Sequence, residues 1–574
     1  MQSVTIRPAV DASKLPSVER LGGDSVAETD DVFPQSVASG GPTPTGVILW
    51  TRIAPEQYDP PTALRVEVAA DADFEDVILR SELPEPSVKP SDNYTVRVDL
   101  AGVLEPNSTY YYRFAYGGVR SRTGRCRTLP ARDTELRRLR LGLLNCQNYQ
   151  NGYFGAMAHL AAADVDFVLH LGDYVYEYAD SDEGASGPYR DRTIELPSKS
   201  SLPMSLDDFR AIYETYKRDP YLRELHERHT VLQTWDDHAI ANDRYWDYDA
   251  DAPVFPDHPC GTVPQFTRYL TRVGIQAWWE FVPARITYDP DADHLHDSFE
   301  LYRVRQFGDL VTVLLTDERL YRSRPLSLSE SVPGRDRKRD SSRTMLGARQ
   351  REWFLDELRD SETTWTVWAN AVLFGSFTLG RPWLRPSRDS WDGYEVERGD
   401  ILAVLEERRR ANGPNFVTLT GDMHTTLVSR IRSRDGERRR LGVEFMTPGA
   451  TSVNFAEKIG EVLSRRFGNR RALNRTFPAY LERAMRRLAR RLNVDFEFFD
   501  SAHWGYSVVT FTPDDCTWEV FWVDKTVNSA NAERNLAHEV CIPVEDGPGD
   551  EQTTGPGPRE RARGRTPRVP RTRV

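Results

Sequence analysis

The chain has 574 residues, which is too long for one small core and predicts two domains or one large α/β domain with appendages. Hydrophobic residues make up 39% of it, and no apolar stretch approaches the roughly 20 residues that cross a bilayer, so no transmembrane segment is predicted. The net charge of -12 disfavours a broad nucleic-acid-binding surface.

The N-terminal residues carry no recognisable export signal. Residues Met1 to Leu21 contain no apolar core and no paired arginines, and these are the features of secretory and twin-arginine signals. We therefore expect a cytoplasmic protein as the chain is written, although a processed precursor would already have lost such a signal.

The five cysteines are widely spaced and contain no CxxC pair. Neither a zinc ribbon nor a disulfide scaffold is therefore predicted. Because their number is odd, at least one thiol is unpaired within the chain, and we expect Cys146 to be that thiol.

Residues 32–130 are predicted to form a small antiparallel β-sandwich. Short β-prone runs alternate there with turn residues at the spacing of such folds. A linker with Pro130 and several charged residues follows, which favours a separate domain over a β-rich extension of the main domain. The β-prone runs are 46–51, 64–68, 94–99 and 110–114.

After Arg137 the pattern changes to buried-looking strands that alternate with amphipathic helices. This alternation predicts an α/β domain of layered sheets and helices over residues 138–545. Residues 546–574 are rich in Gly, Pro and Arg, and they are predicted to form a disordered tail. The predicted strands are 139–144, 165–171, 231–235, 310–315, 364–368, 416–419 and 443–445, with a hairpin of 506–511 and 518–523; the predicted helices are 155–163, 205–217, 266–281, 348–359 and 401–410.

Three further segments have open roles. The polar segments 181–201 and 323–342 are long enough to be insertions, and a plain surface excursion is a commoner outcome than a lid over a site. Residues 479–492 form an arginine-rich amphipathic helix. A solvated helix face is a commoner explanation of that pattern than a membrane-surface role.

Polar side chains follow four of the predicted strands at the point where each strand ends. In open α/β sheets, ligands bind at the carboxyl ends of the strands. Four strands that deliver carboxylate and thiol groups to one rim are hard to explain by core packing alone. The residues are Cys146, Asp173, Asp236, Asp237 and Asp422.

These groups suit a metal-dependent phosphoesterase. A phosphate ester repels incoming hydroxide, and two cations about 4 Å apart can bind its oxygens and lower the pKa of a bridging water. Asp173 can bridge two cations because a carboxylate has two oxygens. Tyr176 supplies a phenolate that suits ferric iron, and a thiolate from Cys146 and an imidazole from His424 would complete a trivalent or borderline site.

A second, divalent cation is predicted on the hard oxygens of Asn242 and Asp422. Each of these residues also has a purely structural explanation. Cys146 can be a small buried hydrophobe, Asp236 and Asp237 can cap a helix, and His238 can orient a carboxylate. The occurrence of all the groups together favours the site.

The chain resembles the PhoD-like alkaline phosphatases, a branch of the calcineurin-like metallophosphoesterases, from about Val32 to Cys541. So many matching segments in the same order make the resemblance specific, whereas each short motif alone is weak. The segments include Val32-Phe-Pro-Gln-Ser-Val-Ala-Ser-Gly40, Asn145-Cys-Gln147, His170-Leu-Gly-Asp-Tyr-Val-Tyr-Glu177, Thr234-Trp-Asp-Asp-His238, Leu315-Thr-Asp-Glu-Arg319 and Gly421-Asp-Met-His424.

The resemblance implies a fold, a metal content and a reaction. The implied fold is a four-layer α/β/β/α metallophosphoesterase sandwich with an N-terminal fibronectin-like β-sandwich. The implied metals are Fe3+ and Ca2+, and the reaction is hydrolysis of phosphomonoesters and phosphodiesters by a metal-bridging oxygen species. By position, Cys146, Asp173, Tyr176 and His424 match the family's iron ligands, and Asn242 and Asp422 match its calcium ligands.

Asp173, His238 and Arg319 are the candidate catalytic residues. Arg319 follows a predicted strand end and is a candidate for contacting the substrate phosphate, while a solvated or sheet-bracing arginine is an equally good explanation. The expected partner is a small phosphate mono- or diester, and the oligomeric state is left open.

Two rival functions remain open from the sequence. A phospholipase D-like phosphodiesterase differs from the leading hypothesis only in substrate preference. A catalytically inactive binding protein would be marked by loss of metal ligands, and all six candidate ligands are present.

Overall fold

The computed structural model describes residues 4–5, 26–179, 189, 191–330, 337, 339–380, 389–411, 413–434, 438–458 and 473–544. The predicted tail 546–574 and parts of both predicted insertions lie outside these residues. In the described part of the chain, no helix is long and apolar enough to cross a membrane.

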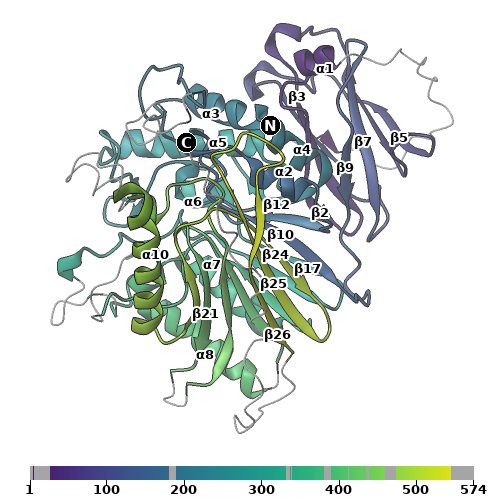
Figure 1. The fold of residues 1–574 in the computed structure, drawn as a ribbon. Coiled ribbons are helices and arrows are strands. Elements are labelled where there is room, and N and C mark those ends of the chain that lie inside the picture. Colours follow the sequence, from purple (N-terminus) through teal and green to yellow (C-terminus); the bar gives the residue numbers. More distant parts are fainter. Residues whose placement is uncertain are drawn as a thin grey trace, which may run out of the picture.

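Two large sheets form the centre of the molecule (Figure 1). The first has ten strands and the second has seven. In order across the first sheet they are β1 (Val4–Thr5), β6 (Thr95–Asp99), β3 (Gly46–Arg52), β2 (Val37–Thr43), β12 (Thr230–Gln233), β11 (Phe167–His170), β10 (Leu139–Leu144), β24 (Gly505–Phe511), β25 (Asp515–Val523) and β26 (Arg534–Pro543). Across the second sheet they are β17 (Arg303–Phe307), β18 (Val311–Leu315), β19 (Trp365–Ala369), β20 (Asn415–Thr420), β22 (Arg440–Met446), β21 (Thr426–Arg432) and β23 (Phe496–Asp500).

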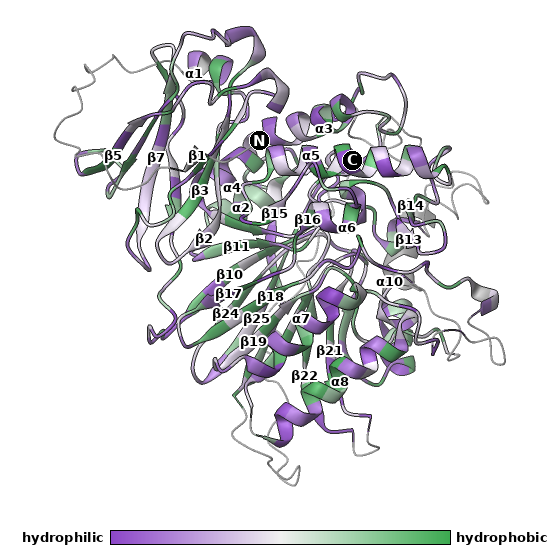
Figure 2. Ribbon diagram, turned by 180° about the vertical axis from the view of Figure 1, so that it is seen from behind, coloured by the Kyte–Doolittle hydropathy of each residue, from purple (hydrophilic) through white to green (hydrophobic). Residues whose placement is uncertain are grey.

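Alternating residues of each strand bury opposite faces of its sheet, as the two-residue period of a strand requires. Phe167 and Leu169 of β11 belong to the core between the two sheets, together with Val313 of β18. Val168, between them in sequence, faces the core on the other side of the first sheet. The central strands are accordingly apolar along most of their length (Figure 2).

Helices cover the outer faces of the two sheets (Figure 1). Those over the first sheet are α2 (Gly155–Ala161), α3 (Leu206–Arg218), α4 (Pro220–Arg228) and α5 (Pro264–Phe281), which share one core with Leu144 of β10. Those over the second sheet are α7 (Gly347–Asp360) and α8 (Glu395–Arg410), which share a core with Leu314 of β18. The remaining elements are α1 (Val26–Val32), α6 (Leu295–Ser298), α10 (Leu473–Leu492) and the two-stranded pairs β13 (Tyr245–Asp247) with β14 (Ala252–Val254) and β15 (Thr287–Tyr288) with β16 (Phe299–Glu300).

The N-terminal region is rich in strands, as predicted, and has its own core around Val66 and Phe114. Its strand β2 pairs in parallel with β12, with Ser39 opposite Thr230. The first large sheet therefore runs without interruption from the N-terminal region into the α/β part. The separate five-stranded sheet contains β5 (Val77–Glu82), β4 (Arg65–Ala69), β7 (Thr109–Tyr116), β8 (Val119–Arg120) and β9 (Gly124–Arg127).

The predicted elements match the observed ones to within a few residues, apart from the start of one helix. Several observed elements were not predicted, among them strands β17, β21, β23 and β26. Helix α8 begins at Glu395, six residues before the predicted start at 401, because its first turns are mostly charged and its buried apolar residues begin at Ile401. Helix α4 was not predicted, although Asp219 caps it and Pro220 occupies its first turn. The α/β class with a β-rich N-terminal region is confirmed.

Helix α10, which contains the predicted arginine-rich helix 479–492, lies along the edge of the second sheet. Ala489 packs with Leu427 of β21 and Phe499 of β23, so part of the apolar side of the helix is covered by the sheet. Arg483 and Arg487 are exposed.

Candidate metal centre

The loops that follow β10, β11 and β20 bring the predicted metal ligands together. Strands β10 and β11 are parallel neighbours, and β20 belongs to the second sheet. Four site residues adopt left-handed backbone conformations, with φ of 49° at Cys146, 52° at Asp173, 66° at Asp422 and 49° at His424. Such conformations cost non-glycine residues about 1–3 kcal/mol each and concentrate at functional sites.

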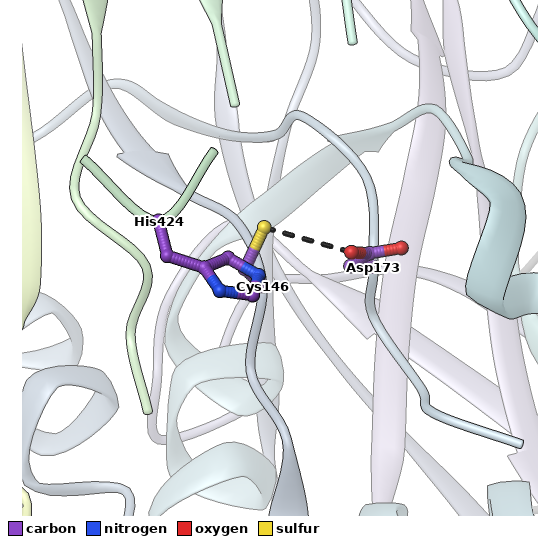
Figure 3. A group of neighbouring side chains, drawn as sticks. All are labelled: Cys146, Asp173 and His424. Carbon is purple, nitrogen blue, oxygen red and sulfur yellow. Dashed lines mark hydrogen bonds between the residues drawn. The ribbon is translucent and has the colours of Figure 1, made fainter. Parts of the chain in front are cut away.

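Cys146, Asp173 and His424 lie side by side (Figure 3), and the Tyr176 hydroxyl contacts both Asp173 and His424. The Cys146 thiol and the Tyr176 hydroxyl both donate to Asp173 Oδ2, over 3.6 Å and 3.0 Å. His424 Nε2 lies 3.1 Å from the Tyr176 hydroxyl. The other ring nitrogen of His424 donates to the carbonyl of Val453 over 2.6 Å, which leaves the Nε2 lone pair directed into the cluster.

Burial controls the protonation of these four groups. It raises the pKa of Cys146, Asp173 and Tyr176 well above their usual values, since the charged forms lose hydration there. Burial also lowers the pKa of His424 to about 3, so this imidazole is neutral and can act as a ligand. Asp173 Oδ1 is buried and has no hydrogen-bond partner.

A second acidic group surrounds Arg319 a short distance away. The Arg319 guanidinium donates through Nε to Asp236 and through Nη2 to Asp422 Oδ1, the latter over 2.8 Å. Its Nη1 lies 3.3 Å from Asp237 Oδ2 and 3.7 Å from Asp389 Oδ2. Although burial opposes it, the carboxylates of Asp236, Asp237 and Asp422 raise the pKa of Arg319 well above its usual value. Arg319 is therefore neither solvated nor simply bracing a sheet.

His238 lies beside the first cluster. Its Nδ1 is 2.6 Å from Glu177 Oε2, and its ring packs on Tyr176 with 4.0 Å between the centroids. Ligand atoms of Asp173, Asp237 and His238 all lie within 4.8 Å of one another. Although burial opposes it, the carboxylates of Glu177, Asp173 and Asp237 raise the pKa of His238 well above its usual value.

The Asn242 side chain is hydrogen-bonded to Asp257, while its backbone adjoins Glu177, the partner of His238. Its side-chain amide donates to Asp257 over 2.5 Å, and its backbone N–H donates to Glu177 Oε1 over 2.7 Å. It lines a small hollow of about 240 Å³ with Leu202 and His258. Its assignment as a calcium ligand stays a prediction.

Two residues of the site were not among the predicted ligands or catalytic residues, although Asp236 was placed at the same rim. Asp236 was given a helix-capping role as its structural explanation, yet its side chain makes no cap hydrogen bond and contacts Arg319 instead. The position of Asp236 shortly after strand β12 was the sequence feature that indicated a place at the site. Ser452, whose hydroxyl lies 2.7 Å from that of Tyr176, had no such signal because nothing in its own segment marks it.

Comparison with known proteins identifies the family. Residues 141–520 match the model of the PhoD-like phosphatase family, and residues 20–130 match the model of its N-terminal domain. The chain belongs to the PhoD-like phosphatase family. Alkaline phosphatase D of Bacillus subtilis (strain 168) is 32% identical over 432 residues, which are 73% of this chain and 69% of that protein. A solved structure titled "Structure of PhoD" superimposes with a TM-score of 0.74 at 27% identity, covering 90% of this chain and 91% of the other.

Membership of the PhoD-like phosphatases makes the chain a phosphoric ester hydrolase, as the resemblance implied. The family is metal-dependent, and two groups of potential metal-binding side chains occur among the described residues. The comparisons favour neither the phospholipase D-like alternative nor the inactive binding protein.

Proposed function

We propose that this PhoD-like phosphatase hydrolyses small phosphomonoesters and phosphodiesters at a centre of Fe3+ and Ca2+. The observation that carries the proposal is the contact of four different ligand types, from Cys146, Asp173, Tyr176 and His424, within one buried cluster. Alkaline phosphatase D, the similar protein from Bacillus subtilis, has the corresponding activity in its name.

The chemistry of the four donors fits ferric iron. A thiolate, a phenolate and a carboxylate together carry three negative charges, and the fourth donor is a neutral imidazole. Burial raises the pKa of Cys146, Asp173 and Tyr176, so the three anions need a strongly charged cation beside them in order to form. The unpaired Oδ1 of Asp173 can serve a second cation.

Asp422 and Asn242 are the proposed calcium ligands, and Asp236 is a further candidate. Asp236 and Asp422 contact the same guanidinium, that of Arg319, so they lie close to each other. Carboxylate and amide oxygens are the ligands that Ca2+ prefers. Asn242 would have to exchange its hydrogen bond with Asp257 for a metal bond.

When bound, the metals supply Lewis acidity toward the phosphoryl group and a lowered pKa for water. The protein's own residues hold the imidazole of His238 in place and deliver a proton to the leaving group. Glu177 accepts from His238 Nδ1 and thereby fixes the imidazole against Tyr176, with Nε2 as the remaining ring nitrogen. In the proposed mechanism His238 delivers a proton from Nε2 to the departing alcohol oxygen.

We also propose that the fold is the four-layer α/β/β/α sandwich of the family. The sequence of helices, sheet, sheet and helices described above supports this assignment. The N-terminal part, residues 32–130, would be the fibronectin-like sandwich, and residues 138–545 would be the catalytic domain. The pairing of β2 with β12 means that this boundary crosses a continuous sheet.

The test is hydrolysis of 4-nitrophenyl phosphate and bis-4-nitrophenyl phosphate by purified protein, before and after chelation of calcium. We expect turnover of both esters that falls on chelation and returns with added Ca2+, in protein that elemental analysis shows to contain iron. Equal turnover with and without chelator, or protein that hydrolyses neither ester while holding both metals, would refute the proposal.

A further inference from the structure

We propose that Arg319 is the internal competitor of the divalent cation: a cation bound at Asp422 displaces the guanidinium from its carboxylates, and the freed guanidinium then contacts the phosphoryl group. This inference rests on the proposed function. It adds a coupling between metal binding and substrate binding that runs through one side chain.

The first support is that Arg319 and the proposed cation use the same oxygens. Arg319 Nη2 donates to Asp422 Oδ1 over 2.8 Å, and its Nε donates to Asp236 Oδ1. Both carboxylates follow strand ends and are the groups that a hard divalent cation would bind. A guanidinium and a divalent cation at these oxygens would repel each other strongly in a site this deeply buried.

The second support is that the backbone of Arg319 is held by a hydrogen bond, while one guanidinium nitrogen has no hydrogen bond and lies beside the partly exposed Asp389. The backbone N–H of Arg319 donates to Asp317 Oδ1 over 2.9 Å, so the residue itself stays in place. Nη1 makes no hydrogen bond. It lies 3.7 Å from Asp389 Oδ2, and the Asp389 side chain is 20% exposed, compared with 0% for Arg319 and 1% for Asp236.

The third support is the charge balance. Asp236, Asp237 and Asp422 surround Arg319, and a divalent cation supplies more positive charge to the same group than a guanidinium does. The cation therefore compensates more of the negative charge of this group than the guanidinium does. The released guanidinium then needs an anion, and a phosphate ester offers the paired oxygens that arginine binds in a bidentate manner.

The experiment compares Ca2+ binding by iron-loaded wild type and Arg319→Gln, after removal of bound calcium, by isothermal titration calorimetry. We expect the variant to bind Ca2+ more tightly by about 10- to 100-fold, which is the range of ordinary coupling between sites. In the same samples, Ca2+ should strengthen the binding of inorganic phosphate more in the wild type than in the variant, because the variant keeps only the direct attraction between Ca2+ and phosphate. A residue that only contacts substrate would alter phosphate binding and leave Ca2+ affinity as it is.

Arg322→Gln is the matched control. Arg322 is equally buried, but its charged contacts are to Asp243 at 3.9 Å and Asp389 at 3.8 Å rather than to Asp236 or Asp422. A gain in Ca2+ affinity as large as that of Arg319→Gln would assign the effect to general charge and overturn the proposal. Unchanged or weaker Ca2+ binding by Arg319→Gln would also overturn it.

A second measurement covers the case in which Arg319→Gln folds poorly, since it leaves three buried carboxylates without their cation. Ca2+ should then raise the melting temperature of the variant more than that of the wild type, and Arg319→Lys should lie between them. A smaller rise in the variant would overturn the proposal. If no sample bound Ca2+, both the competition and the assignment of the calcium site would be wrong. Turnover that did not change on chelation would instead show that the proposed function is wrong.

Discussion

Replacement of Glu177 by glutamine tests whether His238 acts on the leaving group. Glu177 is 3% exposed and accepts two hydrogen bonds, from His238 Nδ1 over 2.6 Å and from the backbone N–H of Asn242 over 2.7 Å. Glutamine has the same shape, but it has one acceptor oxygen where glutamate has two, and it has no charge. One of the two donors therefore faces an amide NH2 in the variant.

The magnitude follows from the bond that is lost. A hydrogen bond to a charged group contributes about 1.5–3 kcal/mol, and each 1.36 kcal/mol corresponds to about a tenfold change in rate. If Glu177 holds His238 in place for proton delivery, kcat should fall by about 10- to 150-fold. The fall should be larger for phenyl phosphate than for 4-nitrophenyl phosphate, because the more basic phenolate depends more on protonation as it leaves.

The assay is kcat for both esters in wild type, Glu177→Gln, His238→Gln and the double variant, with the melting temperature of each as a control. The double variant should be no slower than His238→Gln alone, because the two residues act as one unit. Equal losses for the two esters, or losses that add in the double variant, would refute the reasoning.

Three further predictions concern the metal cluster and the buried charges. Asp173→Asn should lower kcat by at least about 100-fold, since it removes a ligand rather than a residue that supports one, with little change in melting temperature; near-normal turnover with both metals bound would contradict the bridging role. Iron-loaded wild type should be coloured by tyrosinate-to-iron charge transfer, and the band should vanish in Tyr176→Phe, so an unchanged visible spectrum in that variant would contradict the Tyr176 assignment. Burial lowers the pKa of Lys217 from 10.5 to about 7, so the unfolded chain binds more protons than the folded one between these values and stability rises with pH there. Wild type should gain about 2 kcal/mol relative to Lys217→Met between about pH 7.5 and about pH 9.5 in urea unfolding, and a difference that is constant with pH would show that Lys217 is not buried as a neutral amine.

The phosphoesterase chemistry was readable from the sequence because its ligands lie beside local signals. A short apolar run predicts a buried strand, and the residues that follow the run lie at the carboxyl end of that strand. Cys146, Asp173 and Asp422 were found in this way, and in the structure each lies two or three residues after the end of its strand. The proximity of Cys146 to His424 required more than local signals, since the two residues come from different sheets.

The sequence by itself determined the α/β pattern, the strand-end positions of the polar groups and the family to which the chain belongs. Each of these depends on residues that are neighbours along the chain. Tertiary structure alone decided the union of the N-terminal region with the central sheet through β2 and β12, the enclosure of Arg319 by carboxylates and the hydrogen bond of the Asn242 amide with Asp257. These features depend on how the two sheets and their loops pack in space, because hydrogen bonds and charge interactions act over a few ångströms while their partners are tens to hundreds of residues apart in the sequence.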